Sequence, residues 1–424
     1  MNVFKFGGAS VRDAAGIRNV GRIIQQALQR TPLVVVVSAM GKTTNALEDV
    51  VVSYMAGRTD EAQLRWQNVV IAHELIVAEF ELPAPLLAPV RATFAAVAEQ
   101  LKMPPGASTP AAGYDAVYDQ LVSVGEIIST QLVAAYLTHQ NLPVQWADAQ
   151  QLVRTDESFR EGRVDWDTTK TQIGALMAAK PPLVLTQGFI GGTAAGQTTT
   201  LGREGSDYSA AIFAYCLGAE AVTIWKDVPG VLNADPRYFD DTVLLPSLTY
   251  QDATELAYYG ATVIHPKTIK PLQNKRIPLY VRSFVQPHQP GTLVGGEPVA
   301  HPTPSFIFKV NQLLISLHPT DFSFIAEDNL SLIFSLFAEA GVKINLMQNT
   351  ALNFSVVVDS RPERIPDLIE RLRGHFRVSY NEALELITIR HYDQRTIDRV
   401  LIGKTMLLEQ RSRSTVQLVV RDQG

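Results

Sequence analysis

The chain has 424 residues, of which 46% are hydrophobic, so it is long enough for two or three domains with a sizeable core. Its net charge is -5 and its acids and bases are interspersed, which argues against a nucleic-acid partner. The single cysteine, Cys216, can form neither an internal disulfide nor a multi-cysteine metal site, and its isolation predicts a cytoplasmic protein. We expect no signal peptide and no membrane contact, because no apolar run approaches the roughly 20 residues that cross a bilayer.

The first predicted elements alternate between strand and helix. A short strand at 2–6 ends at two glycines, an amphipathic helix follows at about 13–29, and an uninterrupted β-branched run forms a strand at 33–37. Such runs are typical of parallel strands that are covered on both faces. The same alternation returns later in the chain, after a mostly helical stretch at about 45–135, with strands at 183–185 and 221–225 and a helix at 206–216. This order predicts a doubly wound α/β fold with a mostly parallel sheet.

A segment dense in proline and glycine, 286–304, predicts a domain boundary. We therefore place one domain at 1–290 and a second region at 305–424. The predicted elements of the second region follow a ferredoxin-like βαββαβ order, with strands at 312–317, 343–348, 353–358 and 385–389 and helices at 330–340 and 365–372. The last piece, 385–422, lacks a final helix.

Two short motifs follow the first two predicted strands. Lys5-Phe6-Gly7-Gly8 offers a mobile positive charge beside backbone N–H groups that a phosphate can approach, although an ordinary strand-to-helix turn fits the same residues. It matches neither a Walker A loop nor a dinucleotide fingerprint. Ser38 and Thr44 lie after the second strand, where α/β folds bind ligands, and Thr44 could equally cap a helix.

Two longer motifs come later in the chain. The segment Thr198–Ser209 is glycine-rich, carries Arg203 and runs into a helix, so it could bind an anion, or it could be a capped surface loop. The segment Trp225–Arg237 follows a buried strand and could contact nucleotide phosphates, or it could be a loop of solvated charges. Glu126 lies in an apolar helix and needs a cationic partner. We interpret His265, which precedes a proline, as structural.

Taken in this order, the motifs resemble those of the aspartokinases, in the amino-acid kinase superfamily, over essentially the whole chain. The resemblance implies a carbamate-kinase-like catalytic domain, a C-terminal regulatory region of ACT type, ATP with Mg²⁺, and L-aspartate as phosphoryl acceptor. It implies one complete ACT unit at about 311–390 and a truncated second unit. Its members make 4-phospho-L-aspartate, the first step of lysine, threonine and methionine biosynthesis.

The resemblance also implies residue roles. Lys5 and Asp207 are the implied catalytic residues, with Asp207 orienting Lys5 or a metal-bound water. The residues implied for aspartate are Ser38, Thr44, Glu126, Arg203 and Ser206. Those implied for ATP are Lys5, Gly7, Gly8, Lys226, Asp227, Leu232, Arg237, Thr262 and Val263. No direct protein ligand to a metal is implied, since Mg²⁺ would enter bound to ATP.

Four residues depart from the family pattern. Glu204 stands where the family usually has glycine, Lys226 replaces threonine, Leu232 replaces tyrosine and Thr262 replaces a lysine. We hypothesise that Lys226 supplies the phosphate-side charge that is lost at Thr262.

The C-terminal region resembles ACT units that bind an amino-acid effector, lysine or threonine, and that join copies into a homo-oligomer. The implied effector residues are Asn345, Gln348 and Asn349.

Two alternatives to an aspartokinase stay open. One is another enzyme of the superfamily, such as a glutamate or nucleotide-monophosphate kinase. The other is a catalytically silent amino-acid sensor.

Overall fold

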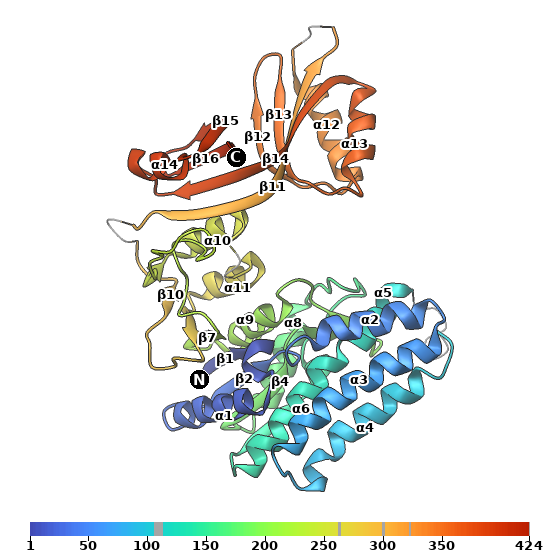
Figure 1. Ribbon diagram of the computed structural model, residues 1–424. Helices are drawn as coiled ribbons and strands as arrows, with labels where there is room; N and C mark the ends of the chain where they lie inside the picture. The colour runs from blue at the N-terminus through green and yellow to red at the C-terminus, as the bar shows by residue number, and fades with distance from the viewer. Residues whose placement is uncertain (106–112, 262–263, 299–301, 322–323, 424) are drawn as a thin grey trace. The chain divides into compact units, whose positions relative to one another are not determined.

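The computed structural model describes residues 1–105, 113–261, 264–298, 302–321 and 324–423 (Figure 1). The chain divides into two compact units. The first is built from Met1–Val231, Leu244–Thr254 and Val263–Pro298. The second is built from Leu232–Val243, Glu255–Thr262 and Val299–Gly424. The last division lies inside the proline- and glycine-rich segment, and the second unit also takes two short pieces from the middle of the chain.

The first unit is organised around an eight-stranded sheet with the order β3-β4-β2-β1-β7-β9-β10-β8. Neighbouring strands are parallel except β9 and β10, which are antiparallel. The doubly wound, mostly parallel sheet that the sequence predicts is therefore confirmed. The strands are β1 (Asn2–Phe6), β2 (Leu33–Val37), β3 (Val144–Ala147), β4 (Leu183–Gln187), β7 (Ala221–Lys226), β8 (Ser247–Leu248), β9 (Leu279–Ser283) and β10 (Thr292–Val294).

The centre of this sheet is apolar on both faces. All five residues of β2 are buried, as expected for a β-branched strand with helices on both sides. β1 pairs in register with both of its neighbours, so that Lys5 lies beside Val36 of β2 and Ile224 of β7. This register carries a lysine to the carboxyl end of three adjacent parallel strands.

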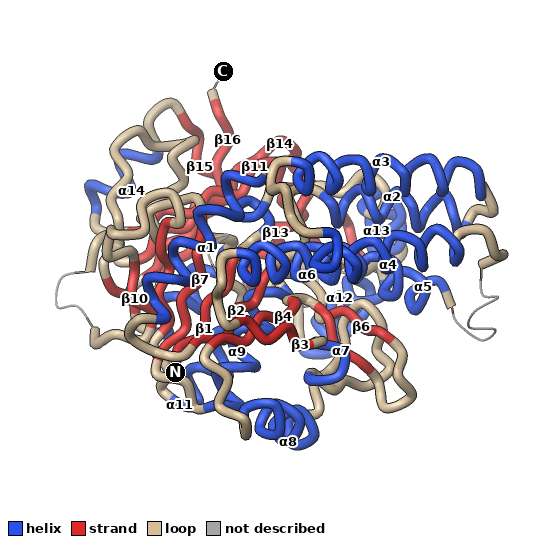
Figure 2. Tube along the Cα trace, turned by 90° about the horizontal axis from the view of Figure 1, so that it is seen from below, coloured by secondary structure: helices blue, strands red, loops and turns tan. Residues whose placement is uncertain are grey.

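Helices cover the two faces of the sheet. Figures 1 and 2 show α8, α9 and α11 on one face and α1 and α6 on the other. The side chain of Asp13 begins α1 by accepting a hydrogen bond from the backbone N–H of Gly16, at 2.7 Å. The helices are α1 (Ala14–Leu28), α2 (Thr43–Met55), α3 (Thr59–Ala78), α4 (Ala84–Gln100), α5 (Tyr114–Val122), α6 (Val124–His139), α7 (Ala149–Leu152), α8 (Trp166–Met177), α9 (Gly205–Leu217), α10 (Tyr250–Tyr259) and α11 (Pro266–Lys275), with the 3₁₀ turn η1 at Gly8–Val11.

The helices α5 and α6 follow one another with only Ser123 between them. Together, Tyr114–His139 is long and apolar enough to cross a membrane by length and composition, and 72% of its most apolar window is buried inside the fold. We expected no such run from the sequence. Its burial explains the composition, because a helix at the centre of a core is apolar on all sides.

A short two-stranded ribbon, β5 (Ile190–Gly192) and β6 (Thr198–Thr200), stands apart from the main sheet. The carboxylate of Asp119 in α5 ties β6 in place, since it accepts hydrogen bonds from the N–H and the hydroxyl of Thr200, each at 2.8 Å. It also accepts from the backbone N–H of Arg160 at 2.8 Å. Three segments that are distant in sequence therefore meet at one buried carboxylate.

The second unit contains a six-stranded sheet with the order β12-β13-β11-β14-β16-β15. Its first six elements have the ferredoxin-like order, and together they support an ACT-like region. The elements are β11 (Ser305–Pro319), α12 (Glu327–Glu339), β12 (Ile344–Asn349), β13 (Phe354–Asp359), α13 (Ile365–Arg373), β14 (Phe376–Arg390), α14 (Gln394–Val400), β15 (Lys404–Arg411) and β16 (Thr415–Asp422).

Two of these strands are much longer than predicted. β11 and β14 pair along most of their 15 residues each, with a register shift between Lys309 and Gln312. The irregularity breaks the alternation of apolar and polar residues, which explains why the sequence showed only parts of each strand. The second half of β14 pairs with β16, and β16 pairs with β15, so that both strands join the same sheet.

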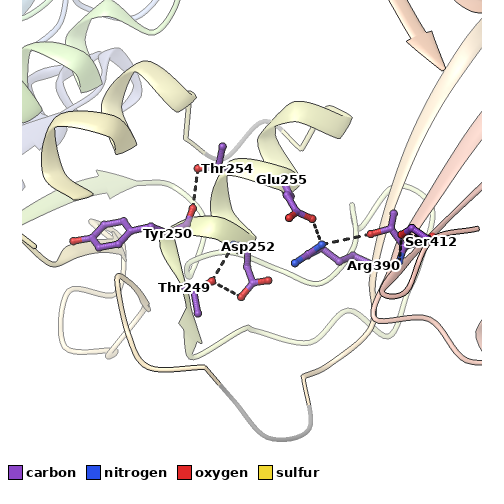
Figure 3. A network of polar contacts seen from close by, with 8 residues as sticks. Thr249, Tyr250, Asp252, Thr254, Glu255, Arg390 and Ser412 are labelled. Carbon is purple, nitrogen blue, oxygen red and sulfur yellow. Dashed lines mark hydrogen bonds and ion pairs between the residues drawn. The ribbon is translucent and has the colours of Figure 1, made fainter. Parts of the chain in front are cut away.

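The end of β14 carries a buried arginine, which Figure 3 shows beside α10. Arg390 forms an ion pair with Glu255, and its guanidinium lies 3.4 Å from the hydroxyl of Thr415. Thr249 and Asp252 bond to each other at the start of α10, where the hydroxyl of Thr249 donates to the carboxylate of Asp252 at 2.6 Å and accepts from the backbone N–H of Asp252 at 3.0 Å. This reciprocal contact begins the helix in the same manner as a capping side chain.

Candidate active site

A pocket of about 680 Å³ opens in the first unit at the carboxyl ends of β1 and β7. This is the edge at which open α/β sheets bind ligands. Four cationic and five acidic side chains line it. The lining residues are Lys5, Ser38, Thr44, Glu48, Tyr118, Glu126, Arg160, Glu161, Phe189, Thr200, Gly202, Arg203, Glu204, Gly205, Ser206, Asp207 and Lys226.

Two lysines converge on one carboxylate in this pocket. Asp207, in the first turn of α9, is buried, and its Oδ1 lies 2.6 Å from Nζ of Lys5. Its Oδ2 lies 3.8 Å from Nζ of Lys226, at the end of β7. Because partial burial strengthens ion pairs, the carboxylate holds the ammonium of Lys5 at one place in the pocket. This cluster concentrates positive charge where a phosphate could be neutralised.

The glycines after β1 have different surroundings. A Cβ added at Gly8 would lie 2.6 Å from the carbonyl oxygen of Ala39, so only glycine lets the turns after β1 and β2 pack this closely. A Cβ added at Gly7 would lie 3.4 Å from Nζ of Lys5. Gly7 therefore lies beside the ammonium group, and Gly8 joins the two turns.

The start of α9 forms a second wall. Its N-terminal N–H groups favour an anion. A Cβ at Gly188 would lie 2.6 Å from Cβ of Ser206, so this glycine lets the helix start approach the end of β4. Glu204 precedes the helix with φ +53° in the left-handed region, where the family's glycine would be unstrained. Arg203 is exposed, and none of the described residues forms an ion pair with it.

Glu126, like Asp207, is a deeply buried acid of the pocket. Its Oε1 accepts a hydrogen bond from the backbone N–H of Ala39 at 3.3 Å, and its Oε2 meets no hydrogen-bond donor among the described residues. Burial raises the pKa of this carboxyl to about 8, against the opposing effects of backbone N–H groups and of Lys5. Gly125 makes this position possible, since a Cβ there would lie 3.0 Å from Cβ of Ala39. A buried carboxyl with one free oxygen is suited to a cationic group of a ligand.

The pocket brings together all of the residues predicted for aspartate and for catalysis, together with Lys226 from the residues predicted for ATP. They are Lys5, Ser38, Thr44, Glu126, Arg203, Ser206, Asp207 and Lys226. The residues predicted for ATP do not all line this pocket. Asp227 does not line the pocket, Leu232 and Arg237 belong to the second unit, and Thr262 and Val263 lie outside the described residues. The side chain of Arg237 is 82% exposed and lies 2.6 Å from Asp235.

Sequence reasoning missed five residues that line the pocket: Glu48, Tyr118, Arg160, Glu161 and Phe189. Phe189 follows the buried strand β4, so its position after a strand end could have revealed it. The other four lie on helices or in a loop without a local motif. Only the tertiary fold brings them to the pocket.

No group of three His, Cys, Asp or Glu side chains is placed to hold a metal ion within the part of the chain that the structure describes. Asp207 is a carboxylate that could face a metal ion carried by a ligand, although it already pairs with two lysines. His265 caps α11, because its Nδ1 accepts from the backbone N–H of Lys267 at 3.1 Å. Its structural interpretation agrees with this contact.

The predicted effector residues lie on β12 of the second unit. Gln348 and Asn349 are exposed, whereas Asn345 is part of a polar network. The amide of Asn345 donates to Asp359 at 2.9 Å and its oxygen accepts from the ammonium of Lys309 at 2.9 Å. A lysine therefore occupies one side of the proposed effector position.

Comparison with known proteins places these features in context. Residues 1–283 match the family described as the Amino acid kinase family. The lysine-sensitive aspartokinase 3 of Escherichia coli is 30% identical over 404 residues, which cover 91% of this chain and 86% of that protein.

Two solved structures of E. coli aspartokinase III are also similar. The complex with lysine and aspartate, in the T-state, has a TM-score of 0.82 at 26% identity. The match covers 99% of this chain and 95% of the chain in that structure. The complex with aspartate and ADP, in the R-state, has a TM-score of 0.76 at 27% identity. This match covers 99% of this chain and 96% of the chain in that structure.

Proposed function

Because this chain belongs to the aspartokinases of the amino acid kinase family, we propose that its pocket carries out phosphoryl transfer from ATP to L-aspartate. The products are ADP and 4-phospho-L-aspartate, and the reaction is the first step of lysine, threonine and methionine biosynthesis. The observation that carries the assignment to this pocket is the convergence of Lys5 and Lys226 on Asp207, within the same cavity as Arg203 and Glu126.

The chemistry follows from the ionisation of the acceptor. The side-chain carboxylate of aspartate has a reference pKa of about 3.9, so it is already a nucleophile at neutral pH and needs no general base. One of its oxygens attacks the γ-phosphorus, and the bond from that phosphorus to the bridging oxygen breaks as ADP leaves with the electron pair. The enzyme must align the two anions and neutralise their charge. Lys5 stabilises the transferring phosphoryl group, and Asp207 holds Lys5 in place.

Aspartate is bound by groups that complement its two charged ends. The exposed guanidinium of Arg203 donates two parallel hydrogen bonds to the α-carboxylate, and the N–H groups at the start of α9 with Ser206 donate to the same group. The ammonium of aspartate pairs with Oε2 of Glu126, which meets no donor among the described residues. Ser38 and Thr44 complete the wall of the pocket on the side of the amino acid.

ATP approaches from the side of Lys226. The nucleotide residues are Lys5, Gly7, Gly8, Lys226, Asp227, Leu232, Arg237, Thr262 and Val263. The position of Lys226 supports the hypothesis that this residue supplies the charge lost at Thr262. Its ammonium lies 3.8 Å from Oδ2 of Asp207. Mg²⁺ bound to ATP would neutralise charge on the phosphate oxygens. Asp207 would face that ion.

The second unit acts as an ACT-type regulatory region, with one complete unit at about 311–390 and a truncated one after it. It joins copies of the chain into a homo-oligomer in the cytoplasm. Lysine or threonine is the effector, which binds at Asn345, Gln348 and Asn349. The supporting observation is the ferredoxin-like order of β11 to β14.

A hydroxylamine assay tests the proposed function. Purified chain is incubated with ATP, Mg²⁺, hydroxylamine and one amino acid at a time, and hydroxylamine traps an acyl phosphate as a coloured hydroxamate. We expect hydroxamate with aspartate and none with glutamate. A signal with glutamate alone would favour another member of the superfamily, and no signal with any substrate would favour a silent amino-acid sensor.

A further inference from the structure

A cluster of three side chains on one wall of the pocket has no role in the proposed binding of aspartate and ATP. Arg160, Tyr118 and Glu48 all line the cavity, and they come from a loop, from α5 and from α2. The guanidinium carbon of Arg160 lies 4.2 Å from the centre of the Tyr118 ring. The hydroxyl of Tyr118 donates a hydrogen bond of 2.5 Å to Oε1 of Glu48.

The backbone of Arg160 is fixed from two directions. Its N–H donates to the buried carboxylate of Asp119 at 2.8 Å. Its φ of +67° lies in the left-handed region, which is unfavourable for a residue with a Cβ. Its carbonyl oxygen would lie 3.2 Å from a Cβ at Gly202, so the two backbones touch. Gly202 directly precedes Arg203. The segments that carry the two arginines are therefore packed against each other at the pocket.

The ring of Tyr118 forms a platform for the guanidinium. Burial, and then the hydrogen bond to Glu48, raise the pKa of Tyr118 to about 12, so the phenol stays neutral in the range where enzymes work. A neutral ring attracts a cation on its face. The guanidinium of Arg160 also lies 3.5 Å from the exposed carboxylate of Asp115, and 47% of the arginine side chain is exposed, which leaves part of its surface open to a ligand in the cavity.

We propose that Arg160 is a second guanidinium for the α-carboxylate of the amino-acid substrate, beside Arg203, and that Tyr118 and Glu48 position it. This inference rests on the proposed function and adds a specificity residue to it. The choice of a carboxylate over a nucleotide phosphate follows from position. Glu48 lies one turn after Thr44 on α2, so the two share a face of the helix. The cluster thus lies with the amino-acid residues, whereas Lys226 lies on the phosphate side.

Steady-state kinetics of the full chain test this assignment. Arg160→Met keeps an unbranched apolar stem over the ring and removes the charge. We expect it to raise KM for aspartate on the order of tenfold, with kcat and KM for ATP changed by less than about twofold. Arg160→Lys should recover part of the loss, since it restores charge without the planar fork. Tyr118→Leu, which removes the platform, should raise KM for aspartate less than Arg160→Met does. Arg18→Met is the matched control, because Arg18 also stacks on an aromatic ring, Phe80, but does not line the pocket.

A substrate lacking the α-carboxylate charge locates the contact. Calorimetric titration with L-aspartate and with its α-amide gives a two-by-two cycle for wild type and Arg160→Met. We expect the variant to weaken binding of aspartate and to leave binding of the α-amide unchanged. An equal loss for both ligands would overturn the assignment, as would a rise confined to KM for ATP. A fall in thermal midpoint without any change in KM would show a purely structural role. Because binding is read without turnover, a wild-type chain that binds aspartate and forms no hydroxamate would contradict the proposed function alone.

Discussion

The buried carboxyl of Glu126 makes aspartate binding depend on pH. In the empty pocket its pKa is raised to about 8 by burial, and its Oε2 meets no donor among the described residues. At pH 7, roughly one molecule in ten therefore carries the ionised form. The ammonium of aspartate pairs with that form, so binding must first remove a proton from the remaining molecules.

The size of this effect follows from the titration curve. If only the ionised form binds, the apparent affinity is reduced about elevenfold at pH 7 and about twofold at pH 8. KM for aspartate should then fall about fivefold as the pH rises from 7 to 8. Close to one proton should be released per aspartate at pH 7, which calorimetry detects in buffers with different ionisation enthalpies. Glu126→Gln should bind aspartate more weakly and should release no proton.

The same group affects the stability of the empty protein. The folded pKa lies above the unfolded value of about 4.3, so the unfolded state holds fewer protons between the two. The free energy of unfolding should therefore fall as the pH rises from about 4.3 through 8, and Glu126→Gln should flatten that slope. A KM for aspartate that stays constant between pH 7 and pH 8, or proton release that persists in Glu126→Gln, would refute this reasoning.

Three further predictions concern other parts of the chain. Glu204→Gly should raise the free energy of unfolding by about 1 kcal/mol, because Glu204 has a left-handed φ of +53°, and a melting curve that moves downward would contradict it. Lys226→Thr should raise KM for ATP about tenfold by removing a charge from the phosphate side, and an unchanged value would count against the compensation for Thr262. Threonine should inhibit at lower concentration than lysine, because Lys309 already places an ammonium against Asn345; stronger inhibition by lysine would exclude this effector site.

Local patterns predicted the centre of the first unit well. The strand of β-branched residues, Leu33–Val37, and the amphipathic helix after Asp13 are found within a residue of their predicted bounds. Their signals are strong because both elements are buried along a regular period. Short strands without such a period, such as β10 in the proline-rich segment, were missed. β11 was shortened because its register shift interrupts the alternation.

The pocket could be predicted only where its residues follow strand ends or belong to motifs. Lys5, Ser38 and Asp207 come from such positions, and they do meet in one cavity. Arg160 and Tyr118 were not predictable, since a buried carboxylate and a glycine contact, not a local sequence pattern, bring them to the wall. Side chains that reach a site through tertiary contacts leave no local trace in one sequence.

The central claim is that acyl-phosphate formation occurs beside Lys5. The most direct test compares hydroxamate production from aspartate by wild type and by Lys5→Ala, at saturating ATP and Mg²⁺. We predict that kcat falls by about two to three orders of magnitude while KM for aspartate changes by less than about threefold. A folded Lys5→Ala variant that keeps the turnover of wild type would contradict the account.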